Sequence, residues 1–197
     1  MFYKILIIIL FNNIILSQSF VDKFISHYEN SYSYKVEFDY LMIVNDKILT
    51  RNNGTIMFSN NKYRLIVDEA LFIYDGNKYY NIINENKEVN VSKENEFSNY
   101  IIPTKLSEIL MDNREKISII KLEDMTLINF SYDIDVDYKI FVNSDYSISK
   151  IDQYFSNGNI NIIIFKKTLF NKVLDDDLFI FDKKKFKDFY INNLWKY

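Results

Sequence analysis

Apolar and polar residues alternate along most of this chain with a period of two, which is typical of half-buried β-strands. The alternation is densest between Gly54 and Ser92. Turn residues interrupt it there, and Asp75-Gly76 is the strongest hairpin signal because both residues tolerate a positive φ. We therefore predict an antiparallel meander in this stretch. Its strands cover residues 55–58, 63–67, 71–74, 79–83 and 88–91.

Further strands are predicted on both sides of the meander. Upstream, residues 34–41 alternate and residues 42–51 continue extended, and Asn52-Asn53-Gly54 is interpreted as the turn into the meander. Downstream, the predicted strands cover residues 117–122, 126–132, 138–142, 148–155 and 159–165. Asn143-Ser144-Asp145 and Asn157-Gly158 are the turns between the last three.

Two segments change to helical spacing. Residues 20–30 place Phe24 and its apolar neighbours on one side and charged residues on the other, which predicts an amphipathic helix. Pro103 begins a second helix that ends at Asp112, because proline is well tolerated in a first helical turn. His27, the only histidine of the chain, falls on the polar side of the first helix. We interpret it as a solvated surface residue.

Residues 1–19 are interpreted as a signal peptide that is removed. Lys4 supplies a positive charge, Ile5 to Phe11 are continuously apolar, and Ser17-Gln18-Ser19 offers the small residues of a cleavage site. The alternative is a membrane anchor. An anchor needs about 20 apolar residues, whereas Asn12-Asn13 interrupt this run, so cleavage is favoured. A single domain then covers residues 20–197.

Composition excludes several classes of function. The chain has no cysteine, so it carries neither disulfides nor the cysteine that anchors a lipid. A formal net charge of −3 without a basic stripe disfavours nucleic-acid binding. Glycine-rich phosphate loops and residue pairs at zinc-binding spacing are missing from the sequence, so we expect no cofactor, no metal and no enzymatic activity. Phenylalanine and tyrosine are abundant instead, with 17 and 16 copies.

The meander resembles the periplasmic outer-membrane lipoprotein carrier family, LolA, in the form found in Bacteroidetes-type bacteria. The resemblance rests on five pieces in the family's order and spacing. They are Gly54, Lys62-Tyr63-Arg64, Asp75-Gly76-Asn77-Lys78, Tyr79-Tyr80 and Glu88-Val89. Pro103-Thr104-Lys105-Leu106 resembles the family's proline-containing helix. Residues 175–186 resemble its closing signature, with Lys183 in place of the expected proline.

The resemblance implies a mainly β, α+β fold: an incomplete, strongly curved antiparallel β-barrel with short α-helices forming a lid over its hydrophobic inner face. It also implies a function. A protein of this family accepts lipoproteins from an inner-membrane ABC transporter, shields their acyl chains, and passes them to an outer-membrane receptor, acting as a monomer and a chaperone in the periplasm.

Candidate binding residues lie on one face of the predicted strands. The lipid cavity is predicted to be lined by Phe38, Tyr40, Ile56, Phe58, Tyr63, Leu65, Phe72, Tyr74, Tyr80 and Ile82. The lid is predicted to contribute Phe24, Leu106 and Leu110. Arg64 matches a widely shared arginine of the family, and we interpret it as a structural, lid or handover contact.

Some alternatives remain open at this stage. Proteobacterial members carry an Arg-Pro pair where this chain has Ser59-Asn60, so the identity of the receptor is in doubt. A general carrier of fatty acid or glycolipid would have the same residues. Calcium binding by Asp175 to Asp177 is disfavoured because Ca²⁺ takes six to eight oxygens. A solvated terminal turn is favoured over an anionic-lipid patch for residues 183–187.

Overall fold

One twelve-stranded sheet forms the body of the molecule. The computed structural model describes residues 19–93, 102–133 and 135–194. The first six strands are β1 (Ser33–Val44), β2 (Lys47–Ser59), β3 (Lys62–Val67), β4 (Ala70–Tyr74), β5 (Tyr79–Ile83) and β6 (Glu88–Ser92). The other six are β7 (Ser118–Lys121), β8 (Met125–Asp133), β9 (Val136–Asn143), β10 (Ile148–Phe155), β11 (Ile160–Phe170) and β12 (Tyr190–Asn193). The meander is therefore confirmed.

The sheet order is β12-β6-β5-β4-β3-β2-β1-β11-β10-β9-β8-β7. Two runs of sequential hairpins, β1 to β6 and β7 to β11, meet where β1 pairs with β11. Every pairing is antiparallel except that of β12 with β6. Within the described residues the two ends of the sheet do not pair with each other, so the molecule is an incomplete barrel, as the family resemblance implies.

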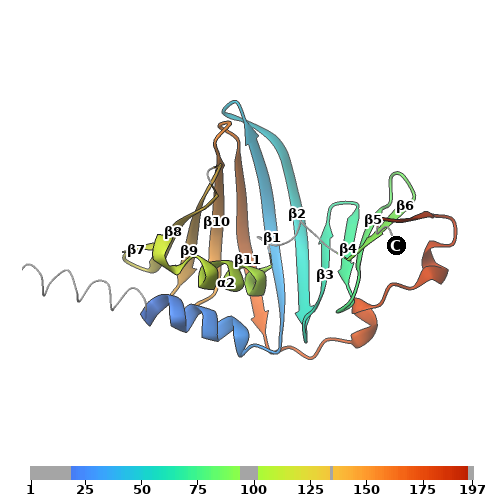
Figure 1. Cartoon of the computed structure of the whole chain (residues 1–197), viewed down its shortest axis with the longest axis horizontal. Coiled ribbons are helices and arrows are strands. Elements are labelled where there is room, and N and C mark those ends of the chain that lie inside the picture. The colour runs from blue at the N-terminus through green and yellow to red at the C-terminus, as the bar shows by residue number, and fades with distance from the viewer. Residues whose placement is uncertain (1–18, 94–101, 134, 195–197) are drawn as a thin grey trace, which may run out of the picture.

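Two helices lie on the same side of the sheet (Figure 1). Residues 19–29 form the N-terminal helix, and α2 spans Pro103–Asp112. Both are within one residue of their predicted bounds. Short 3-10 helices follow at η1 (Arg114–Lys116), η2 (Asp176–Phe179) and η3 (Lys183–Phe186). We call the sheet face that these two α-helices cover the inner face, and the opposite one the outer face.

The first hairpin corrects the sequence interpretation. The turn lies at Asn45-Asp46, which both have positive φ, and Asn52-Asn53-Gly54 continue β2. Gly54 pairs with Phe38, and a Cβ at Gly54 would lie 2.3 Å from Cζ of the Phe38 ring. The glycine is needed for a close side-chain approach and not for a turn. Asn45-Asp46 was overlooked because neither residue is glycine.

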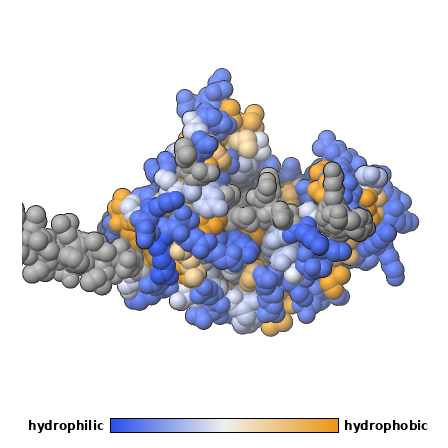
Figure 2. Space-filling model, viewed as in Figure 1, coloured by the Kyte–Doolittle hydropathy of each residue, from blue (hydrophilic) through white to orange (hydrophobic). Residues whose placement is uncertain are grey.

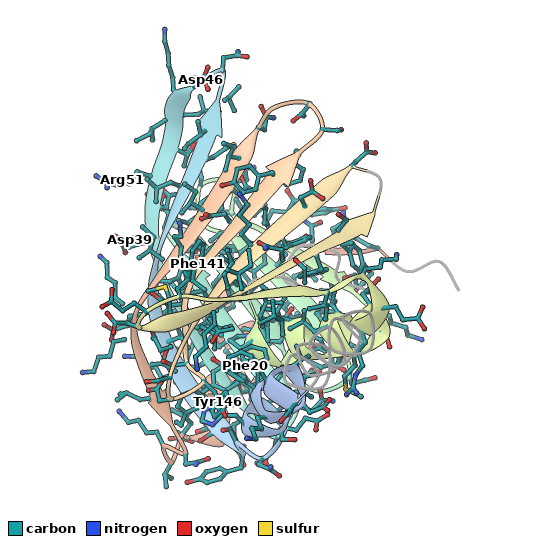
Figure 3. The ribbon with its side chains drawn as sticks, turned by 90° about the vertical axis from the view of Figure 1, so that its left-hand side faces the viewer. Phe20, Asp39, Asp46, Arg51, Phe141 and Tyr146 are labelled. Carbon is teal, nitrogen blue, oxygen red and sulfur yellow. The ribbon has the colours of Figure 1, made fainter. Side chains whose placement is uncertain are left out.

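This hairpin and the neighbouring β10–β11 hairpin project beyond the other strands, and Figure 3 shows Asp46 at the tip of the first. Ile48 and Leu49 are exposed close to the turn. Hydrophobic side chains are visible on this projection in Figure 2. Its surface thus departs from the polar pattern expected of a turn.

The C-terminal segment was only partly predicted. After β11 the chain crosses the outer face of β4 to β6 and adds β12 as a parallel edge strand. A second hydrophobic core forms beneath it, with Ile73, Ile82, Val89 and Val91 packed against Phe181, Phe186 and Phe189. β12 was missed because Tyr190 to Asn193 contains two asparagines and only four residues.

The predicted signal peptide lies outside the described residues, apart from Ser19. Within the described ranges no helix combines the length and apolar character required to cross a membrane.

Candidate functional site

The inner face carries most of the predicted cavity residues. Eight of the ten belong to the large hydrophobic cluster beneath the two helices: Phe38, Tyr40, Ile56, Phe58, Tyr63, Leu65, Phe72 and Tyr74. Their alternation follows directly from the strand pleat, which sends every second side chain to one face. Three of them, Tyr40, Phe58 and Tyr74, are only partly buried. Whether these residues contact a ligand remains a prediction.

Tyr80 and Ile82 lie on the outer face, which corrects their predicted position. Because Tyr74 pairs with Tyr79, the odd-numbered residues of β5 face inward. Tyr80 stacks on Phe181 with ring centroids 4.6 Å apart, and its hydroxyl donates to Asp75 Oδ2 at 3.0 Å. Burial, reinforced by Asp75, raises the pKa of the Tyr80 phenol to about 12. Shifting a strand by one residue exchanges its two faces, which explains the error.

An aromatic row crosses the inner face from β1 to β5. Register pairing aligns Tyr34, Phe58, Tyr63, Tyr74 and Tyr79. The rings of Tyr34 and Phe58 stack at 4.8 Å, and those of Tyr74 and Tyr79 stack at 4.3 Å. Tyr34 and Tyr79 were missed as site residues, although the same alternation that selected Phe38 and Tyr40 includes Tyr34.

The lid residues are buried against this face. Phe24, Leu106 and Leu110 are each 0% exposed and belong to the same cluster as the cavity residues. Their burial confirms that both helices pack on the inner face. In this structure the helices therefore close the site, and a ligand on the inner face would have to displace them.

Among the described residues, few polar contacts fix α2 in place. The hydroxyls of Tyr34 and Thr104 are hydrogen-bonded at 3.1 Å, and Arg114, just after the helix, forms an ion pair with Asp22 at 2.9 Å. That pair is half-exposed and contributes little. The helix has no side-chain N-cap and no basic residue in its last turn. Ten residues without such support are marginal alone, so packing on the sheet keeps α2 helical.

A polar group interrupts the apolar lining near β10 and β11. The hydroxyl of Tyr40 donates to Asn161 Oδ1 at 3.0 Å, and Asn161 Nδ2 donates to Gln153 Oε1 at 3.1 Å. Gln153 is 5% exposed, so these hydrogen bonds satisfy groups that would otherwise be buried alone. Hydroxyl and carboxamide groups make up this set, so these three side chains hydrogen-bond without a formal charge.

His27 is not a solvated surface residue as predicted. Its ring is partly buried against the edge of Phe170, with centroids 4.5 Å apart, and close to Tyr28 and Tyr146. Burial lowers the pKa of the imidazole, and the nearby Asp145 carboxylate opposes that shift. Tyr146 also packs on Phe20 at 5.5 Å, and Figure 3 shows these two residues side by side.

An open groove of about 790 Å³ runs along this helix. Polar side chains dominate its lining, which consists of Ser19, Asp22, Lys23, Ser26, His27, Asn30, Ser31, Tyr146 and Asn171. The groove lies beside the N-terminal helix and not beneath it. Its polarity does not suit an acyl chain.

Arg64 lies on the face opposite the lid. It pairs with Ile73 on the outer face, and its guanidinium donates to the carbonyl of Leu178 at 3.1 Å. Lys62, two residues earlier, approaches Asp176 at 3.5 Å. Both side chains therefore hold the C-terminal segment against the outer face. The structural interpretation of Arg64 fits this position, and a role in handover remains a prediction.

The charged runs near the C-terminus act as caps. Asp175 accepts a hydrogen bond from the amide of Asp177 and so begins η2. Asp182 accepts from the amide of Lys184 and begins η3. Across the described part of the chain, no group of three or more His, Asp or Glu side chains is placed to hold a metal ion.

Comparisons with known proteins bear on the fold. No protein-family model matches the sequence, and no curated protein matches it. An uncharacterized conserved protein from Thermus thermophilus has a similar structure, with a TM-score of 0.60, 6% identity, and coverage of 90% of this chain and 99% of that one. That likeness shows the fold alone.

Two further structures are similar at lower scores. One is a LolA superfamily protein from Nitrosomonas europaea, with a TM-score of 0.45, 10% identity, and coverage of 78% of this chain and 92% of that one. The other is a putative outer membrane lipoprotein-sorting protein domain from Vibrio parahaemolyticus, with a TM-score of 0.44, 9% identity, and coverage of 85% and 97%.

Proposed function

We propose that this chain binds the acyl chains of lipoproteins on its inner face and carries them across the periplasm. The observation that supports this most is an aromatic and aliphatic sheet face covered by two helices. Among the described residues few polar contacts fasten these helices. Each acyl CH₂ removed from water contributes about 0.8 kcal/mol. A lipid can therefore supply the free energy that displaces the lid.

The apolar side chains of the inner face and the lid suit a carrier that must also release its cargo. Aromatic rings and aliphatic side chains hold an acyl chain without directional bonds, so the bound lipid can slide out once the helices move. The sequence motifs that resemble those of the lipoprotein carriers support the specific cargo. In this proposal an inner-membrane ABC transporter loads the chain, which acts as a monomer, and an outer-membrane receptor unloads it.

A fluorescent fatty acid tests the binding step. We expect saturable binding of the probe to residues 20–197, and weaker binding by at least several-fold in Phe58→Ser, which opens the aromatic row. Ile164→Ser is the matched control, because Ile164 lies on the outer face and is already 38% exposed. Equal binding by both variants would place the lipid elsewhere.

A release assay tests the cargo. Residues 20–197 are added to spheroplasts that retain lipoproteins, and a one-to-one complex with a tri-acylated lipoprotein is expected in the soluble fraction. Failure to release lipoprotein, with fatty-acid binding intact, would make the protein a general carrier of fatty acid or glycolipid.

A further inference from the structure

Three asparagines form a row across the inner face at one edge of the sheet. Asn81 on β5 pairs with Asn90 on β6, and Asn90 pairs with Asn192 on β12. Toward the centre of the sheet, Asn81 pairs with the apolar Phe72 on β4. The inner face thus changes from hydrocarbon to carboxamide between β4 and β5. The three strands lie beside each other in Figure 1.

Hydrogen bonding along this asparagine row is incomplete. Asn192 Nδ2 donates to Asn90 Oδ1 at 3.0 Å, which ties β12 to β6. Asn81 Oδ1 is buried and has no partner within the described residues. A buried acceptor without a donor is unfavourable, and a ligand that carries a donor would relieve it. Asn81 is therefore the residue of the asparagine row that a ligand donor can pair with.

The surroundings specify the kind of ligand. Tyr79 lies two residues before Asn81 on the same strand face, so the aromatic row ends beside the asparagine row. On the other side, Glu88 lies on the same face as Asn90 and pairs with Ile83. Carboxamides offer donors and acceptors without charge, and the Glu88 carboxylate disfavours a second anion.

From this placement we infer a head-group subsite: the asparagine row binds the uncharged, hydrogen-bonding head of an amphiphile whose acyl chain lies along the aromatic row. Glycerol hydroxyls and N–H-bearing amides have the required donor, whereas an ester or a fatty-acid carboxylate does not. The inference rests on the proposed acyl-binding function and adds the polar end of the ligand. It also predicts the direction of the ligand, with its chain toward β1 and its head toward β12.

Two single-chain ligands of equal chain length test the subsite at pH 7. A monoacylglycerol and a fatty acid each displace a fluorescent acyl probe from residues 20–197. We expect the unaltered protein to prefer the monoacylglycerol. Asn81→Leu should weaken monoacylglycerol binding about three- to tenfold, as expected for one lost hydrogen bond, and leave fatty-acid binding unchanged.

Asn129→Leu is the matched control. Asn129 also has a buried Oδ1 without a partner within the described residues, but it pairs with Lys139 on the outer face. This variant should alter neither affinity.

The outcomes separate the two proposals. No preference in the unaltered protein, or an equal loss of both ligands in Asn81→Leu, would overturn the subsite and leave acyl binding intact. Failure of the unaltered protein to bind any acyl probe would overturn both. If Asn81→Leu does not fold, Asn192→Ala on the edge strand β12 tests the subsite instead. The Asn192→Ala protein should prefer the monoacylglycerol less than the unaltered protein does. An unchanged preference would contradict binding of the head group by the asparagine row.

Discussion

At the scale of single residues, close packing explains why a particular residue type is needed at positions where the local sequence alone suggests another role. Gly54 and Phe38 show this most clearly, because the ring occupies the space where any other residue would place its Cβ. The backbone carbonyl of Ile66 lies on the same side, 2.7 Å from that position. An asparagine-rich stretch followed by glycine resembles a turn, and only the facing strand reveals that it is not.

Gly54→Ala should therefore destabilise the protein, by about 1–3 kcal/mol as overpacked cores generally do. Urea unfolding measures the change in the free energy of unfolding. The cost should be smaller in a Phe38→Leu background, where the ring no longer collides, but it should not vanish because the Ile66 carbonyl remains. Asn53→Ala, at the exposed neighbouring position, should have little effect.

His27 predicts a pH dependence. Burial lowers its pKa below the usual 6.5, so the unfolded chain binds a proton more readily than the folded one. Its contribution to stability is complete above pH 6.5 and is lost as the pH falls below that value. Asp145 weakens the effect without reversing it.

Unfolding midpoints at pH 7.5, 6.5 and 5.5 measure this dependence. The unaltered protein should lose more stability on acidification than His27→Gln, since the substitution removes the imidazole whose pKa is lowered by burial. Parallel curves for the two proteins would contradict the assignment.

At the scale of elements, the inner face and the lid differ in how their positions are fixed. Ladder hydrogen bonds hold the strands, whereas α2 depends on a buried apolar side and on Thr104. Periodicity alone predicted both helices and most strand positions. It failed for β5, where the residue that pairs across the Asp75-Gly76 turn decides which face is inner, and for β12, where a four-residue strand is too short for a pattern.

Tyr34→Phe tests how firmly the lid is held. Removing the hydroxyl leaves Thr104 without its partner and should cost about 1 kcal/mol, equivalent to roughly fivefold more frequent opening of α2. Amide hydrogen exchange in residues 103–112 should accelerate by that factor, and uptake of an acyl probe should quicken.

Tyr40→Phe is the control for this measurement. It loses a hydrogen bond on the same face, to Asn161, but none to a helix. Exchange in α2 should not change, and acceleration in both variants would mean that the tyrosine hydroxyls stabilise the whole sheet instead of the lid.

At the scale of the whole molecule, the sheet has a different cover on each face. The helices cover the inner face, and residues 171–189 cover the outer face of β4 to β6. The half-barrel was an expectation from the family resemblance, whereas the strands and hairpins could be predicted because alternation and turn residues are local. The second core could not, since it joins Ile73 and Ile82 to Phe186 through contacts that span about half of the chain.

A chain that ends at Asn171 should not remain a soluble monomer. It retains every strand from β1 to β11 but exposes the Ile73, Ile82, Val89 and Val91 cluster to water. Size-exclusion chromatography should show aggregates or a loss of soluble protein. A chain that ends at Leu194 keeps β12 and should behave as the full one does.

The pairing of β1 with β11 sets the order in which the molecule can fold. Tyr34 meets Phe170 across this seam, whereas the hairpins on either side join neighbours in sequence. In a newly synthesised chain the local hairpins form first. The pairing of β1 with β11 can form only after nearly all of the sequence has been made. Until then β1 has a long unpaired edge with Val36 and Phe38 beside it. Newly made chains are therefore prone to join one another along this edge at the centre of the sheet.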